Sequence, residues 1–103
     1  MTPEPPVPVL AHFRPLSPVL DVTFDKPLRP GALAATNWFG RRNDTLWNVL
    51  VPPNAAGSVV TMTTNPIGPH YGPDIVNYGA TPADVVTATF FVPAAGFTQF
   101  PIT

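Results

Sequence analysis

The sequence predicts an all-β protein, an antiparallel sandwich of about seven short strands in one domain. Pro makes up 16 of the 103 residues, roughly three times the usual share of about 5%. Each interior Pro costs a helix about 3 kcal/mol or more, so long helices are excluded. Short β-prone runs instead recur roughly every 8–14 residues with turn signals between them, which is typical of a sandwich. Val, Leu, Ile and Phe together exceed the share of about 20% below which chains stay disordered.

The clearest strand is predicted at residues 19–25. Every second residue from Leu20 to Phe24 is apolar, and the residues between them are polar. This period of two indicates a strand with one buried and one solvated face. Pro18 and Pro27 flank the run, and Pro cannot extend a ladder of hydrogen bonds. This strand is therefore expected to form part of the core.

The same signals predict the remaining elements along the chain. Further strands are expected at residues 9–13, 37–39, 46–51, 58–64, 75–78, 85–92 and 97–102. Turns or loops are expected at residues 30–36 (one helical turn), 41–44, 52–57 and 65–74. Trp38 is expected in the core, and the Tyr78 hydroxyl is expected to close a loop. Gly40, Gly57, Gly72 and Gly96 are expected to be turn glycines.

Charge is scarce in this chain. Five Lys+Arg and six Asp+Glu give a net charge of −1, and charged residues make up 11% of the chain, against a usual share of about 25%. Such a balance predicts no nucleic-acid or membrane partner. It favours either a surface that another protein covers or simply a surface module of low charge. Cysteine is absent, which excludes disulfides and thiolate metal sites.

The chain divides into a Pro-rich N-terminal arm, residues 1–8, and a sandwich domain, residues 9–103. The arm is expected to be extended polyproline II, either as a disordered tail or laid across a neighbouring subunit. Neither a basic leader nor a long apolar run occurs near the start, so we expect synthesis in a cytoplasm without membrane insertion.

No catalytic or metal-binding motif is present in the sequence. His12 and His70 lack metal-ligand spacing, and neither serine lies in a G-x-S-x-G turn. The carboxylates are scattered, although Asp74 and Asp84 flank one predicted strand and could share a cation. The sequence therefore predicts a protein that is not an enzyme and has no cofactor or metal.

The candidate partner-binding residues come from three places. The arm contributes Pro5, Pro6, Val7 and Pro8, and the predicted 41–44 hairpin loop contributes Arg41 and Arg42 as peripheral ion-pairing groups. Trp47 and Tyr71 could stack on a sugar, although a core or interface role is the stronger alternative for both aromatic rings.

The opening of the sandwich resembles bacterial Ig-like domains of the surface-layer type. The resemblance is carried by Leu-Asp-Val-Thr-Phe-Asp-Lys-Pro-Leu at 20–28, Gly-Ala-Leu at 31–33 and Asn37-Trp38. Towards the end it is carried by Val-Asn-Tyr at 76–78 and Pro-Ala-Ala-Gly-Phe at 93–97. It covers about residues 19–103 and implies an Ig-like sandwich. The family usually occurs as repeated modules in large secreted proteins, whereas a single module is present here.

A free-standing module of this kind is similar to auxiliary structural proteins of tailed-phage particles, an analogy of fold. The resemblance implies a capsid decoration protein that binds other virion proteins and its own copies as a homo-oligomer or symmetric array. Its location would be the virion. The alternative is an adhesion or carbohydrate-binding module of a larger bacterial cell-surface protein, which would place it outside the cell.

Overall fold

A computed structural model describes residues 4–14, 17–42, 45–65, 74–81 and 83–103. Tyr71, His70, Gly72 and most of the expected 65–74 loop lie outside the described residues. So do the two residues at the tip of the expected 41–44 hairpin loop.

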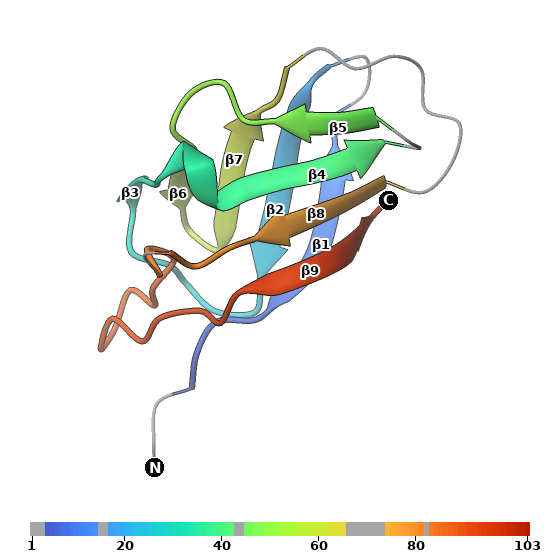
Figure 1. The fold of residues 1–103 in the computed structure, drawn as a ribbon. Coiled ribbons are helices and arrows are strands. Elements are labelled where there is room, and N and C mark those ends of the chain that lie inside the picture. The colour runs from blue at the N-terminus through green and yellow to red at the C-terminus, as the bar shows by residue number, and fades with distance from the viewer. Residues whose placement is uncertain (1–3, 15–16, 43–44, 66–73, 82) are drawn as a thin grey trace.

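The described chain is almost entirely β, in two antiparallel sheets that face each other as a sandwich (Figure 1). The first sheet, in spatial order, is β1 (Pro8–Phe13), β2 (Val19–Phe24), β7 (Val59–Thr63), β6 (Asn54–Ala56) and β3 (Gly31–Ala32). The second is β5 (Thr45–Asn48), β4 (Trp38–Arg42), β8 (Asp74–Tyr78) and β9 (Phe97–Ile102). A 3-10 turn, η1 (Ala35–Asn37), leads into β4. The all-β prediction is thus confirmed.

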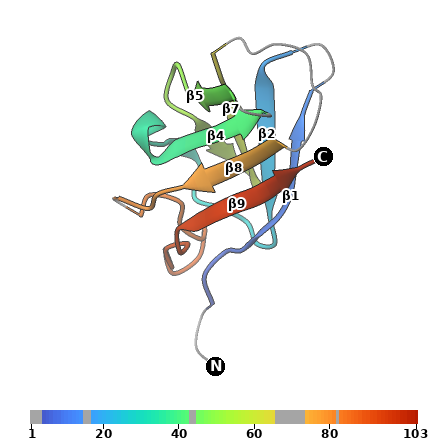
Figure 2. The same ribbon diagram turned by 45° about the vertical axis from the view of Figure 1, so that its right-hand side comes forward.

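The core lies between the two sheets, and β2 contributes to it as its alternation predicts. Leu20, Val22 and Phe24 are buried, while the residues between them are partly exposed. On the inner side of the second sheet, Trp38 of β4 packs on Tyr78 of the neighbouring β8, with ring centroids 4.7 Å apart. Figure 2 shows the two sheets from the side, with β9 next to β1 at one edge. The Thr103 amide donates to the Ala11 carbonyl there, at 2.9 Å.

Several predicted elements are wrong. Residues 52–57 were expected as a loop but contain β6, which forms because it pairs with β7. Arg41 and Arg42 were expected in a hairpin loop but are the last residues of β4. The expected strand 85–92 contains only isolated bridges around a turn at 88–91. β-Propensity describes fit to a pleated surface, and here local hydrogen bonds bend the chain instead.

The boundary between arm and domain lies earlier than residue 8. Pro8 already belongs to β1, and Pro6 is buried. The Val7 amide donates to the Asp25 carboxylate at 2.8 Å, and the Asp25 amide donates to the Val7 carbonyl at 2.9 Å. The hydrogen bond from the Val7 amide is the main reason that the pKa of Asp25 lies below its ordinary value, and Lys26 adds to the effect. Residues 6–8 are therefore attached to the sandwich.

Gly40 is a strand residue and not the turn glycine expected. It pairs with Trp47 of β5 in the middle of β4. A Cβ atom on Gly40 would lie 2.2 Å from both the Ile75 carbonyl oxygen and Cζ2 of Trp47. Gly40 thus leaves room for the indole of Trp47, which is fully buried and meets Phe13 edge-on at 6.0 Å. By contrast, Gly57 has φ +60° in the turn between β6 and β7, as predicted.

Candidate interaction surfaces

The outer face of the second sheet carries apolar side chains around one arginine. Arg41 pairs with Leu46 on one side and Ile75 on the other, and Ile75 pairs with Pro101. Residues directly opposite in an antiparallel sheet project from the same face. Phe39 precedes Arg41 by two residues and so shares that face. We call Phe39, Arg41, Leu46, Ile75 and Pro101 the sheet face.

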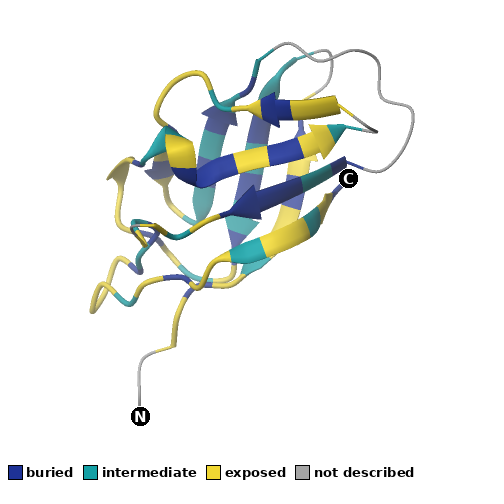
Figure 3. Ribbon diagram, in the orientation of Figure 1, coloured by how far each residue is buried: buried dark blue, intermediate teal, exposed yellow. Residues whose placement is uncertain are grey.

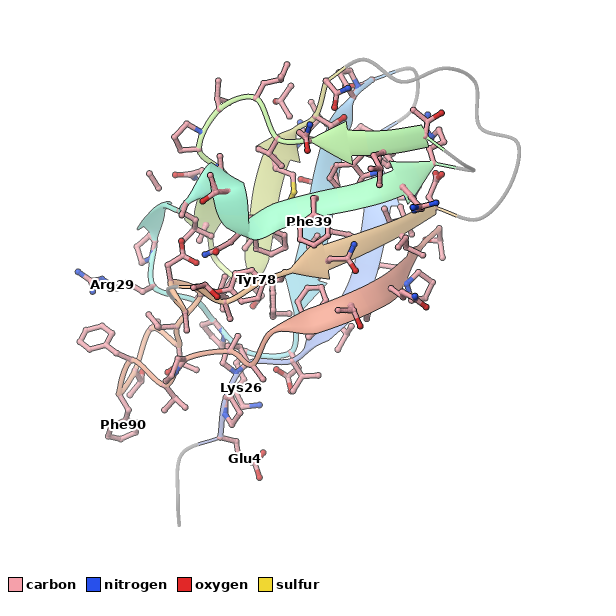
Figure 4. The ribbon with its side chains drawn as sticks, viewed as in Figure 1. Glu4, Lys26, Arg29, Phe39, Tyr78 and Phe90 are labelled. Atoms are coloured by element: carbon pink, nitrogen blue, oxygen red, sulfur yellow. The ribbon has the colours of Figure 1, made fainter. Side chains whose placement is uncertain are left out.

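The sheet face is open to solvent although it is largely apolar. Leu46 is 60% exposed and Phe39 is 43% exposed. Figure 3 shows exposed and buried residues alternating along β4, so the exposed ones point away from the core. In Figure 4 the Phe39 ring lies on the outside of the sheet. Exposed apolar groups gathered on one rigid face are typical of interaction sites.

A hollow of about 350 Å³ adjoins Phe39 at the end of the sheet. Its lining residues are Ala35, Thr36, Trp38, Phe39, Asn48 and Val49. Both η1 and the end of β5 thus contribute to it. The hollow extends the sheet face and provides space for a side chain of a partner.

The structure separates the sequence-predicted partner-binding residues. Arg41 is exposed on the sheet face, as the prediction requires, whereas Arg42 points into the end of the sandwich. The Nε of Arg42 lies 3.2 Å from an Asp74 carboxylate oxygen, and its guanidinium lies 4.6 Å from the Phe13 ring centroid. Arg42 is therefore an internal ion-pairing residue, and its predicted peripheral role is wrong.

Trp47 is also not a surface residue. Its side chain is 0% exposed, so no face of the indole is open for sugar stacking. The predicted partner-binding role of Trp47 is wrong, because the ring fills the space that Gly40 leaves. In the arm, Pro6 is fully buried, so its predicted partner-binding role is wrong, whereas Pro5 and Val7 are exposed and Pro8 is half-buried. The partner-binding role of these last three residues stays a prediction, as does that of Tyr71.

A hairpin spanning residues 85–94 forms the second candidate surface. The Thr87 amide donates to the Val92 carbonyl at 3.0 Å, and the Ala94 amide donates to the Val85 carbonyl at 2.7 Å. The hairpin is also bonded to the segment after β2, because the Ala88 amide donates to the Pro27 carbonyl at 3.0 Å. The Thr87 hydroxyl accepts from the Val92 amide at 2.9 Å. Figure 1 shows this hairpin projecting from the same end as the N-terminus.

The base of the hairpin is buried and its tip is exposed. Val85 and Ala94 are buried, whereas Phe90 is 75% exposed and Phe91 is 57% exposed. Both phenylalanines adopt left-handed backbone conformations, with φ 69° and 52°. The Arg29 guanidinium lies 5.1 Å from the Phe91 ring centroid. We call Phe90 and Phe91 the hairpin tip.

An apolar pocket of about 230 Å³ lies beside the hairpin tip. Its lining residues are Glu4, Lys26, Pro27, Thr87, Thr89 and Phe90. Figure 4 shows Glu4, Lys26 and Phe90 at this end of the molecule, with Phe90 extending away from the sandwich. We call this hollow the tip pocket.

Sequence reasoning missed Phe39, Leu46, Phe90 and Phe91. The outward direction of Phe39 and Leu46 follows from alternation with Gly40 and Trp47, but only when both of these are known to be buried. Phe90-Phe91 stands inside an almost continuous β-prone run, which concealed the turn. The available signal was the preceding Thr-Ala-Thr, because Thr hydroxyls bond to nearby backbone groups and stabilise turns.

Asp74 and Asp84 do not form a shared cation site. Asp74 begins β8 and pairs with Arg42, while Asp84 lies beyond the other end of that strand and accepts from the Tyr78 hydroxyl at 2.9 Å. Within the described residues, no group of three or more His, Asp or Glu side chains could hold a metal ion. The Nδ1 atom of His12 lies 2.7 Å from the Thr103 carbonyl oxygen. His70 lies outside the described residues.

No family model, curated protein or solved structure matches this chain. In the part of the chain that the structure describes, no helix is long and apolar enough to cross a membrane.

Proposed function

We propose that this chain is a non-enzymatic structural protein of a virus particle, a capsid decoration or auxiliary protein of a tailed phage. In this proposal it binds the particle surface through the sheet face. The observation that carries the proposal is the exposure of Phe39 and Leu46 around Arg41 on a rigid sheet. The virion as the setting rests on the resemblance of residues 19–103 to Ig-like modules.

The strand order supports the Ig-like assignment. If β1, β2, β6 and β7 correspond to strands A, B, D and E, the first sheet contains the order A-B-E-D. The second sheet, β5-β4-β8-β9, then corresponds to C′-C-F-G. Ig-like sandwiches divide their strands in this way between two sheets. The short β3 at the edge of the first sheet is an addition to this pattern.

The chemistry of the sheet face fits a protein partner. Burial of a Phe or Leu side chain is worth about 1.5–3 kcal/mol each, and such groups form the centre of interfaces. Arg41 is exposed among these apolar groups and would pair with a carboxylate of the partner, a contact that affects orientation more than affinity. The low charge of the chain reduces the cost of removing polar groups from water.

The adhesion or carbohydrate-binding alternative loses its main support. It relied on Trp47 or Tyr71 as a stacking platform, and Trp47 is fully buried. Tyr71 lies outside the described residues, so no observation favours this alternative over a protein partner.

Variants of the sheet face test the proposal. Particles stripped of this chain are mixed with purified protein, and the bound fraction is measured by co-sedimentation over a range of concentrations. We expect Leu46→Ser to weaken binding at least about tenfold, because it removes one buried apolar group. Arg41→Glu should also weaken binding, and more strongly at low salt than at high salt.

Leu50→Ser is the matched control, because Leu50 is equally exposed at 60% but lies outside the sheet face. Its binding should equal that of the unchanged protein. If Leu46→Ser and Leu50→Ser bind alike, the sheet face does not carry the function.

A further inference from the structure

We propose that the hairpin tip binds a second copy of this chain, with Phe90 of each copy inserted into the tip pocket of the other. This inference rests on the proposed function in that a symmetric array needs contacts between copies. It uses a surface separate from the sheet face, because the hairpin projects from one end of the sandwich (Figure 4).

The hairpin tip is unfavourable for a domain that stays alone. A left-handed conformation is strained for a bulky residue, and two consecutive phenylalanines adopt it here. Both rings are also largely exposed to water, although the hairpin that carries them is anchored by a buried base. Strain held by a rigid surround is characteristic of functional positions.

The tip pocket has the size and the lining for a phenyl ring. An apolar cavity of about 150 Å³ is sufficient to hold benzene, and the tip pocket measures about 230 Å³. Pro27 and Phe90 give it apolar walls. Phe90, 75% exposed, stands at its edge, so ring and pocket are adjacent on one surface.

This adjacency suits a twofold dimer. In a twofold interface the same patch is used by both copies, so a group that protrudes must lie beside the hollow that receives its equivalent. A twofold axis next to Phe90 brings each ring to the pocket of the other copy.

The tip pocket carries one acidic and one basic residue, so the pockets of two copies are complementary in charge. Glu4 and Lys26 both line the tip pocket, so a twofold rotation that exchanges the pockets can bring Glu4 of each copy towards Lys26 of the other. Lys26 donates to Asp25 at 2.9 Å within its own chain. An ammonium has three donors, so this bond leaves Lys26 able to bond Glu4 as well.

Sedimentation equilibrium of the purified chain, without particles, tests this dimer. We expect a reversible dimer, and we expect Phe90→Ala to weaken it about 100-fold. Each dimer loses two inserted rings, and one ring is worth at least about tenfold in affinity. Leu50→Ser is again the control and should leave the dimer unchanged. Circular dichroism verifies that Phe90→Ala is folded, as expected for an exposed residue.

Charge exchange gives a second, independent readout. Glu4→Lys and Lys26→Glu should each weaken the dimer, and the two substitutions together should restore it. A chain that stays monomeric at millimolar concentration overturns the inference, and so does a dimer that folded Phe90→Ala leaves intact. Because particles are absent, either result leaves the proposed function standing. Loss of the Leu46→Ser effect on particles would overturn the proposed function without affecting the dimer.

Discussion

Tyr78 makes three hydrogen bonds through one oxygen atom, and all reach the segment that leads into the hairpin. Its hydroxyl donates to the Asp84 carboxylate at 2.9 Å and accepts from the amides of Asp84 and Val85, at 2.9 and 3.1 Å. The same carboxylate accepts from the Ala34 amide at 2.6 Å. Tyr78 and Asp84 together therefore join β8, the hairpin and the segment before η1. The loop-closing role predicted for Tyr78 is confirmed.

Burial raises the pKa of Tyr78 to about 12, and the Asp84 carboxylate adds to the rise. The folded state thus favours the neutral phenol, and its contribution to stability is complete below the unfolded pKa of about 10. As the pH rises from about 10 to about 12, the unfolded chain loses its proton first and this contribution disappears.

We expect Tyr78→Phe to reduce the free energy of unfolding by about 1–3 kcal/mol at pH 7, because the buried Val85 amide and the partly buried Asp84 amide lose their acceptor. The free energy of unfolding of the variant should also fall less than that of the unchanged protein as the pH rises from about 10 to about 12, because the titration of Tyr78 is removed. Urea unfolding at pH 7 and pH 11 measures both effects. Tyr71 is present in both proteins, so its titration cancels in the comparison. Equal stabilities at pH 7 would contradict the structural role of Tyr78.

At the scale of elements, alternation predicted β2 well because its run was uninterrupted and flanked by prolines. Prediction failed where the decisive contact was distant in sequence. β6 is a strand because β7 pairs with it, and Gly40 belongs to a strand because Trp47 lies over it. The strand predicted at 85–92 was wrong for the opposite reason, because local hydrogen bonds of Thr87 outweighed a strong β propensity.

Gly40→Ala tests the packing of β4 on β5. A Cβ atom at this position meets a backbone oxygen as well as the indole, so the neighbours cannot move aside cheaply. We expect a loss of about 3 kcal/mol or more, which lowers Tm by about 12 °C or more. Thermal unfolding followed by circular dichroism measures the change.

Gly57→Ala is the matched control for this substitution. No atom lies within 4 Å of the Cβ that it adds, so its cost is limited to the left-handed conformation, about 1–2 kcal/mol. A Gly40→Ala variant no less stable than Gly57→Ala would show that Trp47 does not pack as described.

At the scale of the whole molecule, composition indicated the all-β class, because many prolines exclude long helices. It could not indicate which side chains stay exposed after folding. Arg41 was found as a candidate from the sequence, but the apolar residues around it emerge only from the register of four strands. The hairpin tip likewise depends on backbone conformations that no pattern of residue types specifies.

In the two proposals the sandwich uses two separate surfaces, the sheet face for a particle and the hairpin tip for a second copy. A subunit of an assembly needs both kinds of contact, since one holds it to the scaffold and the other to its neighbours. The account therefore predicts a fixed, symmetric number of copies on each particle.

Quantitative mass spectrometry of particles purified from the source of this chain tests that prediction most directly. We expect the chain to remain bound through density-gradient purification, at a constant ratio to the major shell protein that matches the particle symmetry. Absence of the chain from purified particles, or a ratio that varies between preparations, would contradict the account.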